Sequence, residues 1–134
     1  MALLSILALA STVGIHDCAP GRSLFAINSL YVEPMNLKGS DPFRIHLRYA
    51  VPDGLLIKNG TAQYSVTYNY IPFPPIYMPL CDIVTCPIKP GIYTNQTMNK
   101  WPWGIRESIS TQINWLDENR ALLLCLTITG RAIW

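Results

Sequence analysis

The chain has 134 residues, of which half are hydrophobic and 13% are charged, with a formal net charge of +2. This length suffices for one domain with a hydrophobic core, and the composition is too apolar for an intrinsically disordered protein. Lysines and arginines are scattered along the chain rather than clustered. The composition therefore argues against nucleic acid as a partner and against an electrostatic membrane anchor.

Residues 1–10 form an apolar run that is typical of a secretory signal peptide. Ala8-Leu9-Ala10 matches a small-residue cleavage site, although no Lys or Arg precedes the run. The alternative is an ordinary buried N-terminal segment. The run is too short to span a bilayer, and no later stretch is long enough, so we predict no transmembrane helix. We predict a signal peptide at 1–10, one domain at 11–134, and a secreted or endolysosomal location.

The four cysteines are Cys18, Cys81, Cys86 and Cys125. An even number behind a signal peptide predicts two disulfides, for which three pairings exist. A Cys81–Cys86 bridge would pin a tight local loop, and would leave Cys18 to tie the start of the mature chain to Cys125 near its end. A zinc site built from all four cysteines is the alternative, but the spacing lacks the usual C-x2-C pairs. We therefore predict no metal.

Strand periodicity dominates the chain after residue 20. Phe43 to Val51 alternates strictly between apolar and polar residues, and the same alternation recurs from Ala62 to Tyr70. Pro52-Asp53-Gly54 predicts a turn, and Asn59-Gly60 predicts a hairpin turn. About seven short strands without a convincing amphipathic helix predict an antiparallel β-sandwich or barrel. The clearest predicted strands span 24–32, 43–51, 62–70, 91–98, 105–115 and 121–133, and in the last of these Leu123 falls on the face opposite Leu122 and Leu124.

Catalytic residues are scarce. His16 lies next to the predicted mature N-terminus, and His46 lies on the polar face of a strand beside Arg44 and Arg48. That position indicates a solvated surface histidine. No nucleophile elbow, zinc-protease helix or glycine-rich phosphate loop occurs. We therefore predict that the protein is not an enzyme and uses no cofactor.

Apolar residues also occur where loops are predicted, in the proline-rich stretch 71–80 and around Cys81 and Cys86. Loops usually lie on the surface, so these residues either cap the core or line the entrance to a pocket. The inward faces of the predicted strands are equally open to two interpretations, a packed core or a cavity between separated sheets. Two sequons, at Asn59 and Asn95, are candidate glycosylation sites in a secreted protein.

Several short motifs are spread over nearly all of the mature chain. They are Asp17-Cys18, Val32-x-Pro34, Lys38-Gly39, Ile57-Lys58-Asn59-Gly60, Leu80-Cys81-x4-Cys86-Pro87-Ile88 with Gly91, Trp101-Pro102-x-Gly104-Ile105 and Leu124-Cys125. With these motifs in this order, the chain resembles the ML lipid-recognition family, which includes the Niemann–Pick type C lumenal sterol carrier, the ganglioside activator and phosphatidylglycerol/phosphatidylinositol transfer proteins. A further short cysteine pair found in many members is missing between Met35 and Asp41, which leaves the subgroup open.

The resemblance implies an immunoglobulin-like β-sandwich of two antiparallel sheets with an internal hydrophobic cavity for one lipid, a sterol or a phospholipid. It also implies the pairings Cys18–Cys125 and Cys81–Cys86, and a lipid-binding and transfer function without catalysis. Transient contact with membranes follows from such a function. The expected cavity residues are Phe43, Tyr49, Tyr64, Val66, Tyr68, Ile109, Ile113, Trp115, Leu124 and Leu126, and the expected mouth residues are Phe73, Ile76, Ile83, Val84, Ile88 and Tyr93.

The same sequence features also allow a different class of function. The exposed aromatic residues of a secreted sandwich can dock another protein, which would make the chain an interaction subunit or a co-receptor accessory protein rather than a lipid carrier. Bound lipid in the purified protein would favour the carrier, and a stable protein complex that survives lipid removal would favour the interaction subunit.

Overall fold

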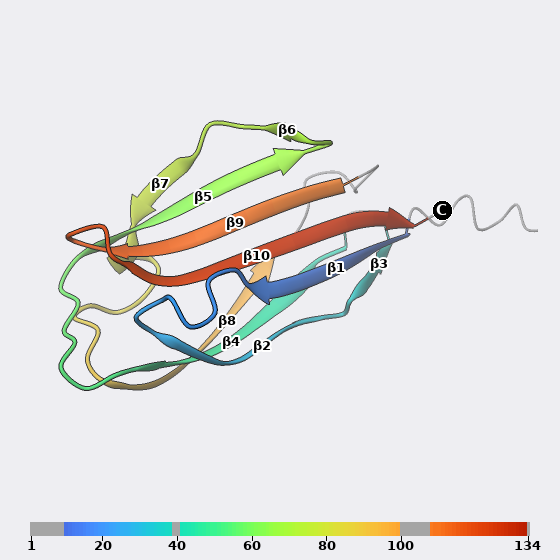
Figure 1. Cartoon of the computed structure of the whole chain (residues 1–134). Coiled ribbons are helices and arrows are strands. Elements are labelled where there is room, and N and C mark those ends of the chain that lie inside the picture. Colours follow the sequence, from blue (N-terminus) through green and yellow to red (C-terminus); the bar gives the residue numbers. More distant parts are fainter. Residues whose placement is uncertain (1–9, 39–40, 100–107, 134) are drawn as a thin grey trace, which may run out of the picture.

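The structure is a computed structural model that describes residues 10–38, 41–99 and 108–133 (Figure 1). Within these residues the regular secondary structure is β-strand apart from one short 3-10 helix, and no helix is long and apolar enough to span a membrane. The elements are β1 (Ala10–Asp17), β2 (Ala26–Glu33), β3 (Asn36–Lys38), β4 (Phe43–Val51), β5 (Gly60–Tyr68), β6 (Ile71–Pro72), β7 (Ile76–Pro79), the 3-10 helix η1 (Leu80–Asp82), β8 (Gly91–Asn99), β9 (Ser108–Asp117) and β10 (Leu122–Ile133).

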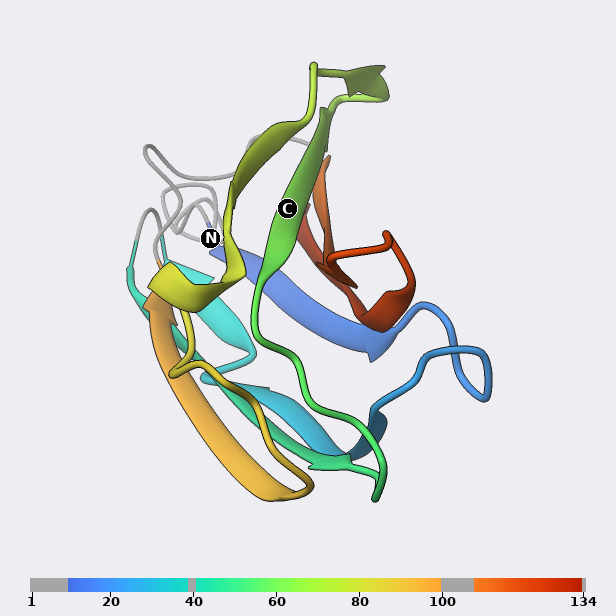
Figure 2. The same ribbon diagram turned by 90° about the vertical axis from the view of Figure 1, so that its left-hand side faces the viewer.

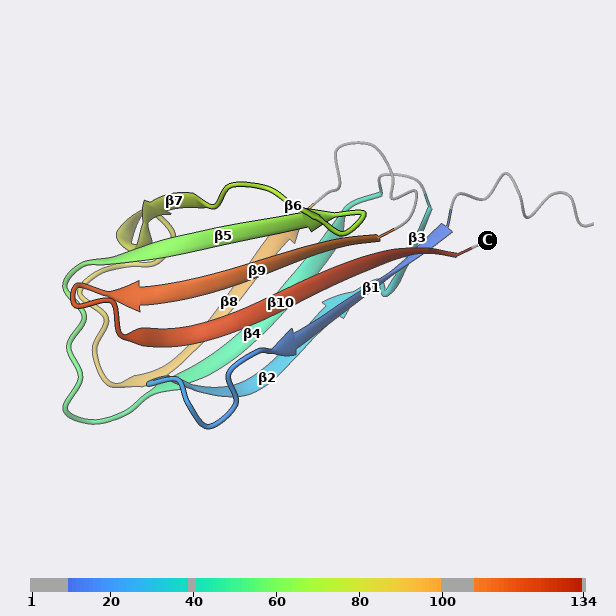
Figure 3. The same ribbon diagram turned by 45° about the horizontal axis from the view of Figure 1, so that its top comes forward.

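The strands form two antiparallel sheets that lie face to face. The large sheet has the order β3-β1-β10-β9-β5-β6, with β7 also pairing with β5, and the small sheet has the order β2-β4-β8. Figure 3 shows β5, β9, β10 and β1 side by side in the large sheet, with the small sheet behind it. The predicted antiparallel β-sandwich is therefore confirmed.

Alternating side chains turn one face of each sheet inward. On β4 the residues Phe43, Ile45, Leu47, Tyr49 and Val51 are all buried, as the strict alternation predicted. The facing strands of the large sheet contribute rows that are fixed by register, such as Ala62 opposite Trp115 and Trp115 opposite Leu124. Burial of these rows between the sheets is the main source of stability of the fold.

Two local features shape the large sheet. A β-bulge between Leu122 and Leu124 breaks the alternation, so Leu123 is as fully buried as Leu124, and the predicted placement of Leu123 on the opposite face is wrong. Gly60 lies so close to β9 that a Cβ atom there would be 2.5 Å from the Leu116 carbonyl oxygen. Gly60 is therefore required by this close approach and does not form a hairpin turn. The predicted hairpin at Asn59-Gly60 is wrong, because β4 and β5 belong to different sheets.

The strand prediction missed β1, β3, β6 and β7, and it overran the end of β5. The strand β1 was not predicted, because its residues follow directly on the apolar run that was assigned to a signal peptide. The proline-rich stretch predicted as a loop contains β6 and β7, which pair with β5 at the sheet edge. Proline is tolerated there because an edge strand need not donate every amide. The strand predicted to reach Tyr70 ends at Tyr68, because Asn69 and Tyr70 adopt positive φ angles of 50° and 66° in a turn.

Other predictions fall outside the described residues, namely those on residues 1–9, on the start of the strand predicted at 105–115 and on the Trp101–Ile105 motif. The proposed signal peptide overlaps the described part of the chain only at Ala10, where β1 begins.

His46 differs from the prediction of a solvated histidine. Its side chain is only 11% exposed, although it lies on the outer face of the small sheet. Nε2 of His46 is 2.6 Å from Oε1 of Glu33, and the imidazole ring stacks on Tyr31 with a centroid separation of 4.4 Å. Neighbours on the adjacent strand β2 therefore cover a residue that alternation alone placed in water.

Both disulfides implied by the resemblance are present. Cys18, which follows β1, is joined to Cys125 of β10, and Cys81 is joined to Cys86 across five positions. Because every cysteine is paired, none is available as a zinc ligand.

Candidate functional site

A cleft of about 120 Å³ lies between the two sheets, and we call it the inter-sheet cleft. Its walls come from β4 and β8 of the small sheet, from β5, β9 and β10 of the large sheet, and from the loop closed by Cys81–Cys86. Most of the lining is apolar and comes from residues far apart in the sequence. The lining residues are Ile45, Leu47, Tyr64, Ile83, Asn95, Thr97, Asn99, Ile113, Trp115 and Leu126.

A second hollow, of about 320 Å³, lies beside the cysteine loop, and we call it the loop hollow. It shares Ile83 and Asn95 with the inter-sheet cleft, so these two side chains stand between the two spaces. Figure 2 shows η1 and the loop after it running alongside β8, at the edges of the two sheets. The residues that line the loop hollow are Tyr49, Ile83, Val84, Thr85, Ile88, Tyr93, Thr94 and Asn95.

Local hydrogen bonds fix the cysteine loop in this position. The amides of Ile83 and Val84 both donate to the Leu80 carbonyl, over 2.9 and 3.0 Å. Ile88 exchanges two backbone hydrogen bonds with Ile57, over 2.8 and 3.0 Å. The Leu80 side chain is fully buried. The loop is thus anchored in the core at both ends, while Ile83 and Val84 between the anchors are half-buried and face the hollow.

The predicted cavity residues separate into three groups. Tyr64, Ile113, Trp115 and Leu126 line the inter-sheet cleft. Phe43 and Leu124 are buried in the core, and Tyr49 is buried there while also reaching the loop hollow. Val66, Tyr68 and Ile109 are half-buried at the far end of β5 and β9 and do not line the cleft.

Tyr49 is the centre of an aromatic cluster at the floor of the loop hollow. Its ring stacks on Phe25 and on Tyr93 and meets Trp115 edge-on, each with a centroid separation of 5.5 Å. Burial, with a smaller contribution from the nearby Tyr93 hydroxyl, raises the pKa of Tyr49 to about 12. Burial also raises the pKa of Tyr64. Both phenols therefore present neutral surfaces to the two spaces at physiological pH.

The predicted mouth residues fall into two groups that lie in different places. Ile83, Val84, Ile88 and Tyr93 line the loop hollow together, although Ile88 is only 2% exposed and belongs to the hollow's floor rather than to its rim. Phe73 and Ile76 lie elsewhere, on the segment that forms β6 and β7. There they belong to a row of exposed apolar side chains that we call the apolar ledge, which comprises Tyr70, Ile71, Phe73, Ile76, Tyr77 and Met78.

Sequence reasoning missed the residues that β4 and β8 contribute to the cleft. Ile45 and Leu47 were predicted to face inward but were not assigned to the cavity. Asn95, Thr97 and Asn99 were missed because an apolar lining was expected. The signal that identifies them is their alternation along β8, which places all three opposite the inward row of β4.

The two sequons differ in accessibility. The Asn59 side chain is exposed at the residue before β5, where a glycan can extend into solvent. Asn95 lines both the inter-sheet cleft and the loop hollow. A glycan on Asn95 would therefore fill the space between the sheets. Asn59 remains a candidate glycosylation site.

The comparisons with known proteins agree with this architecture. The ML-domain family model matches residues 12–132, and the chain therefore belongs to the ML-domain family, which confirms the predicted membership. The fold is similar to that of chicken MD-1 complexed with lipid IVa, with a TM-score of 0.57, 12% identity and coverage of 92% of this chain and 91% of that chain. It is equally similar to a Niemann–Pick type C2 protein from the Japanese carpenter ant, with a TM-score of 0.57, 12% identity and coverage of 86% and 96%. A comparison with curated protein sequences gives no match.

Proposed function

We propose that this protein binds one lipid between its two sheets and transfers it between membranes, without catalysis, in a secretory or endolysosomal lumen. The observation that carries this proposal is an apolar cleft lined by both sheets that adjoins a second hollow at the sandwich edge. Membership of the ML-domain family and the lipid IVa complex of chicken MD-1 support it. The two disulfides fit an oxidising compartment.

The volume of the cleft indicates how a lipid enters. About 120 Å³ is smaller than the roughly 300–1,000 Å³ of typical small-molecule sites. An acyl chain therefore requires movement of Ile83, which separates the cleft from the loop hollow, and some separation of β8 from β5. Each Å² of apolar ligand surface that leaves water then contributes about 25 cal/mol to binding. This gain offsets the cost of opening the contacts between the sheets.

The apolar ledge is the proposed surface for transient membrane contact. Its six side chains are exposed, and the stretch from Tyr70 to Leu80 contains no charged residue. Exposed apolar patches of this kind mark surfaces that contact membranes or other proteins. The ledge pairs with β5, which also contributes Tyr64 to the inter-sheet cleft, so a membrane held at the ledge would lie close to the route of the lipid.

Lipid extraction from protein secreted by a eukaryotic host tests the proposal. The protein is purified without detergent, its mass is measured under native conditions, and the extracted lipids are identified by mass spectrometry. We expect about one lipid per chain. A protein that remains lipid-free in these preparations and takes up no lipid from vesicles would contradict the proposal.

The ledge also favours a second candidate function, a secreted interaction subunit that docks another protein through the same exposed side chains. Sizing and crosslinking in native extract distinguish the two functions. A complex that survives lipid removal and is lost when Phe73 and Ile76 are both replaced by Ser supports the interaction subunit. Unchanged lipid transfer in that double variant would show that the ledge is not the membrane-contact surface.

A further inference from the structure

The edge strand β8 carries polar residues on the face that it turns toward the cleft. Its outward face mixes Ile92 and Met98, which are 59% and 58% exposed, with Thr94 and Gln96. Its inward face continues from Tyr93 to Asn95, Thr97 and Asn99, which line the inter-sheet cleft, Asn95 and Asn99 half-buried and Thr97 exposed at the opening. A strand that only closes a hydrophobic core would show the opposite arrangement, with apolar residues inward and polar residues in water. We call Asn95, Thr97 and Asn99 the polar row.

The neighbouring strand β4 does not share this polar inward face. Register places Asn95 opposite Leu47 and Thr97 opposite Ile45. Both partners on β4 are buried and apolar, and Trp115 and Leu126 close the cleft from the large sheet. The polar row is therefore the one continuous strip of hydrogen-bonding side chains in the lining, which otherwise offers only the Tyr64 hydroxyl and the Trp115 indole N–H. It follows the edge of the small sheet, where the cleft approaches solvent.

The polar row has hydrogen-bonding capacity to spare. Asn99 donates from Nδ2 to the Thr97 hydroxyl over 3.1 Å and to the Thr97 carbonyl over 3.5 Å. The side-chain oxygen of Asn99 and the side-chain amide of Asn95 have no hydrogen-bond partner among the described residues. Amide and hydroxyl side chains can both donate and accept, so the row matches a ligand group that does the same. Hydroxyl and amide groups of lipids have this property.

Charge is absent from the same surface. None of the described residues that line the inter-sheet cleft or the loop hollow is Asp, Glu, Lys, Arg or His. An ionised phosphate or carboxylate taken into such a lining would lose hydration without gaining a counter-ion, which is strongly unfavourable. Lys89 is exposed near the loop hollow. The Tyr93 hydroxyl accepts a hydrogen bond from the Lys89 amide and donates one to the Lys89 carbonyl, so its proton is not free to bind a ligand.

We infer that the polar row selects lipids whose polar end is an uncharged hydroxyl or amide group, held by Asn95, Thr97 and Asn99, over lipids whose polar end is ionised. This inference rests on the proposed function and deepens it by naming the ligand class. The acyl or ring portion lies against Trp115 and Leu126, and the polar end lies at the edge formed by β8.

The test uses four probes that share one oleoyl or oleyl chain and differ only in the polar end. They are monooleoylglycerol and oleyl alcohol, which are uncharged, and oleic acid and oleoyl-lysophosphatidylglycerol, which are ionised at pH 7.5. Affinities are measured by titration below the critical micelle concentration, on delipidated protein made in a host that does not attach N-glycans. This choice of host matters because changes at Asn95 or Thr97 also remove a sequon. We expect the two uncharged probes to bind at least about fivefold more tightly than the ionised probes.

Matched variants on the two faces of β8 locate the effect. Thr97→Val and Asn95→Leu change the polar row, whereas Gln96→Leu makes the same kind of change at an exposed position of the outward face, away from both spaces. The double inward variant is expected to bind monooleoylglycerol about tenfold more weakly. Its midpoint of thermal unfolding should change little, because Asn95 is half-buried and Thr97 is exposed, so neither substitution removes buried packing. The outward variant should leave affinity unchanged.

Each outcome decides between the possibilities. Equal affinity for charged and uncharged probes, or full retention of monooleoylglycerol binding by the inward variant, overturns the inference while leaving lipid binding intact. Failure of all four probes and of vesicle lipids to bind overturns the proposed function itself. Preference for the uncharged probes that disappears in the inward variant alone supports the inference.

Discussion

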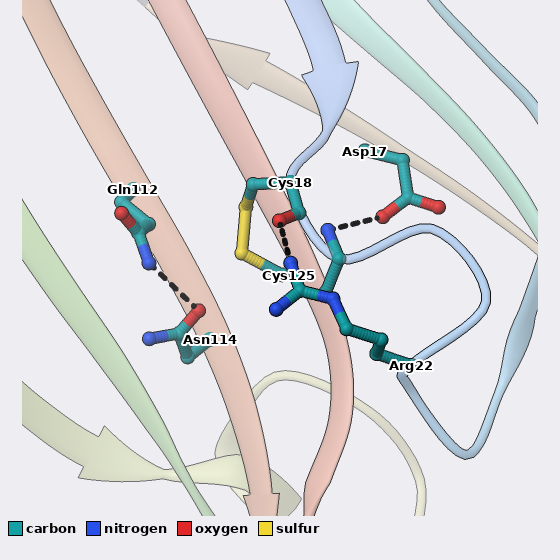
Figure 4. The surroundings of a disulfide bond; sticks show 7 residues. Asp17, Cys18, Arg22, Gln112, Asn114 and Cys125 are labelled. Carbon is teal, nitrogen blue, oxygen red and sulfur yellow. Dashed lines mark hydrogen bonds between the residues drawn. A yellow bond between two sulfur atoms is a disulfide. The ribbon is translucent and has the colours of Figure 1, made fainter.

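The two disulfides lie in different surroundings. Cys125 is 3% exposed within β10, and its carbonyl accepts a hydrogen bond from the Cys18 amide over 3.1 Å. Arg22 donates from Nη2 to the Cys18 carbonyl over 3.2 Å, and Asp17 accepts from the Ala19 amide over 2.9 Å (Figure 4). The Cys81–Cys86 bridge instead closes a half-exposed loop whose residues Ile83 and Val84 face the loop hollow.

The two disulfides therefore have different roles. The Cys18–Cys125 bridge joins positions 107 residues apart and fastens the end of β1 to the middle of the large sheet. The Cys81–Cys86 bridge spans five positions and holds one wall of a binding space. The first should therefore act mainly on global stability, and the second mainly on ligand entry.

The largest effect is expected from replacing Cys18 and Cys125 together by Ser. Opening a loop of this length should lower the free energy of unfolding by roughly 4–5 kcal/mol, because the unfolded chain regains conformational entropy. Urea denaturation measures the loss. Lipid affinity, measured where the variant is still folded, should change less than threefold, and a large loss of affinity without a loss of stability would contradict the division.

A smaller effect on stability is expected at high pH, from the buried Tyr49 at the floor of the loop hollow. Because the pKa of Tyr49 is raised to about 12 in the folded state, the unfolded chain ionises first as pH rises above 10. Stability is therefore fully present below pH 10 and falls as pH rises toward 12, by roughly 2–3 kcal/mol. Tyr49→Phe should remove this part of the pH dependence. Stability curves of equal slope for both proteins between pH 10 and pH 11.5 would contradict the assignment.

Replacing Cys81 and Cys86 together by Ser tests whether the cysteine loop controls lipid entry. The short loop predicts a loss of only about 2 kcal/mol in the free energy of unfolding. The rate of lipid uptake from vesicles should change at least about threefold, because Ile83 and Val84 are no longer held in place. Stopped-flow fluorescence with a labelled lipid measures the rate, and an unchanged rate would remove the cysteine loop from the entry route.

The smallest expected effect on stability comes from Ile83→Ala. This half-buried side chain separates the cleft from the loop hollow, so its truncation should cost about 1 kcal/mol of stability and speed lipid exchange several-fold. Ile92→Ala, at an exposed position of β8, is the matched control and should change neither quantity. Slower exchange in Ile83→Ala would show that Ile83 holds the lipid rather than blocks its path.

A strand with one buried face was predictable from the sequence at β4, where alternation reports directly on burial, whereas on β5 only Ala62 is fully buried. The inward side of β9 was found in the same way, and Ile113 and Trp115 do line the cleft. Alternation could not distinguish cleft from core, because Phe43 and Leu124 show the same pattern and are fully packed.

Other features depend on neighbours that the sequence does not place. The burial of His46 results from Tyr31 and Glu33 on an adjacent strand. The pairing of β7 with β5 depends on long-range backbone contacts at prolines that locally favour a loop. The polar row was overlooked because the site was expected to be uniformly apolar, although its alternation is visible in the sequence.

Photolabelling tests the central claim, that lipid binds in the inter-sheet cleft, most directly. Monooleoylglycerol with a diazirine near the middle of its chain is loaded at equimolar concentration, irradiated, and the labelled residues are mapped by peptide mass spectrometry. Binding in the inter-sheet cleft should place labels on Ile113, Trp115 and Leu126 of the cleft and on Ile83 at its boundary. Labels confined to the apolar ledge, with none on these four residues, would contradict it.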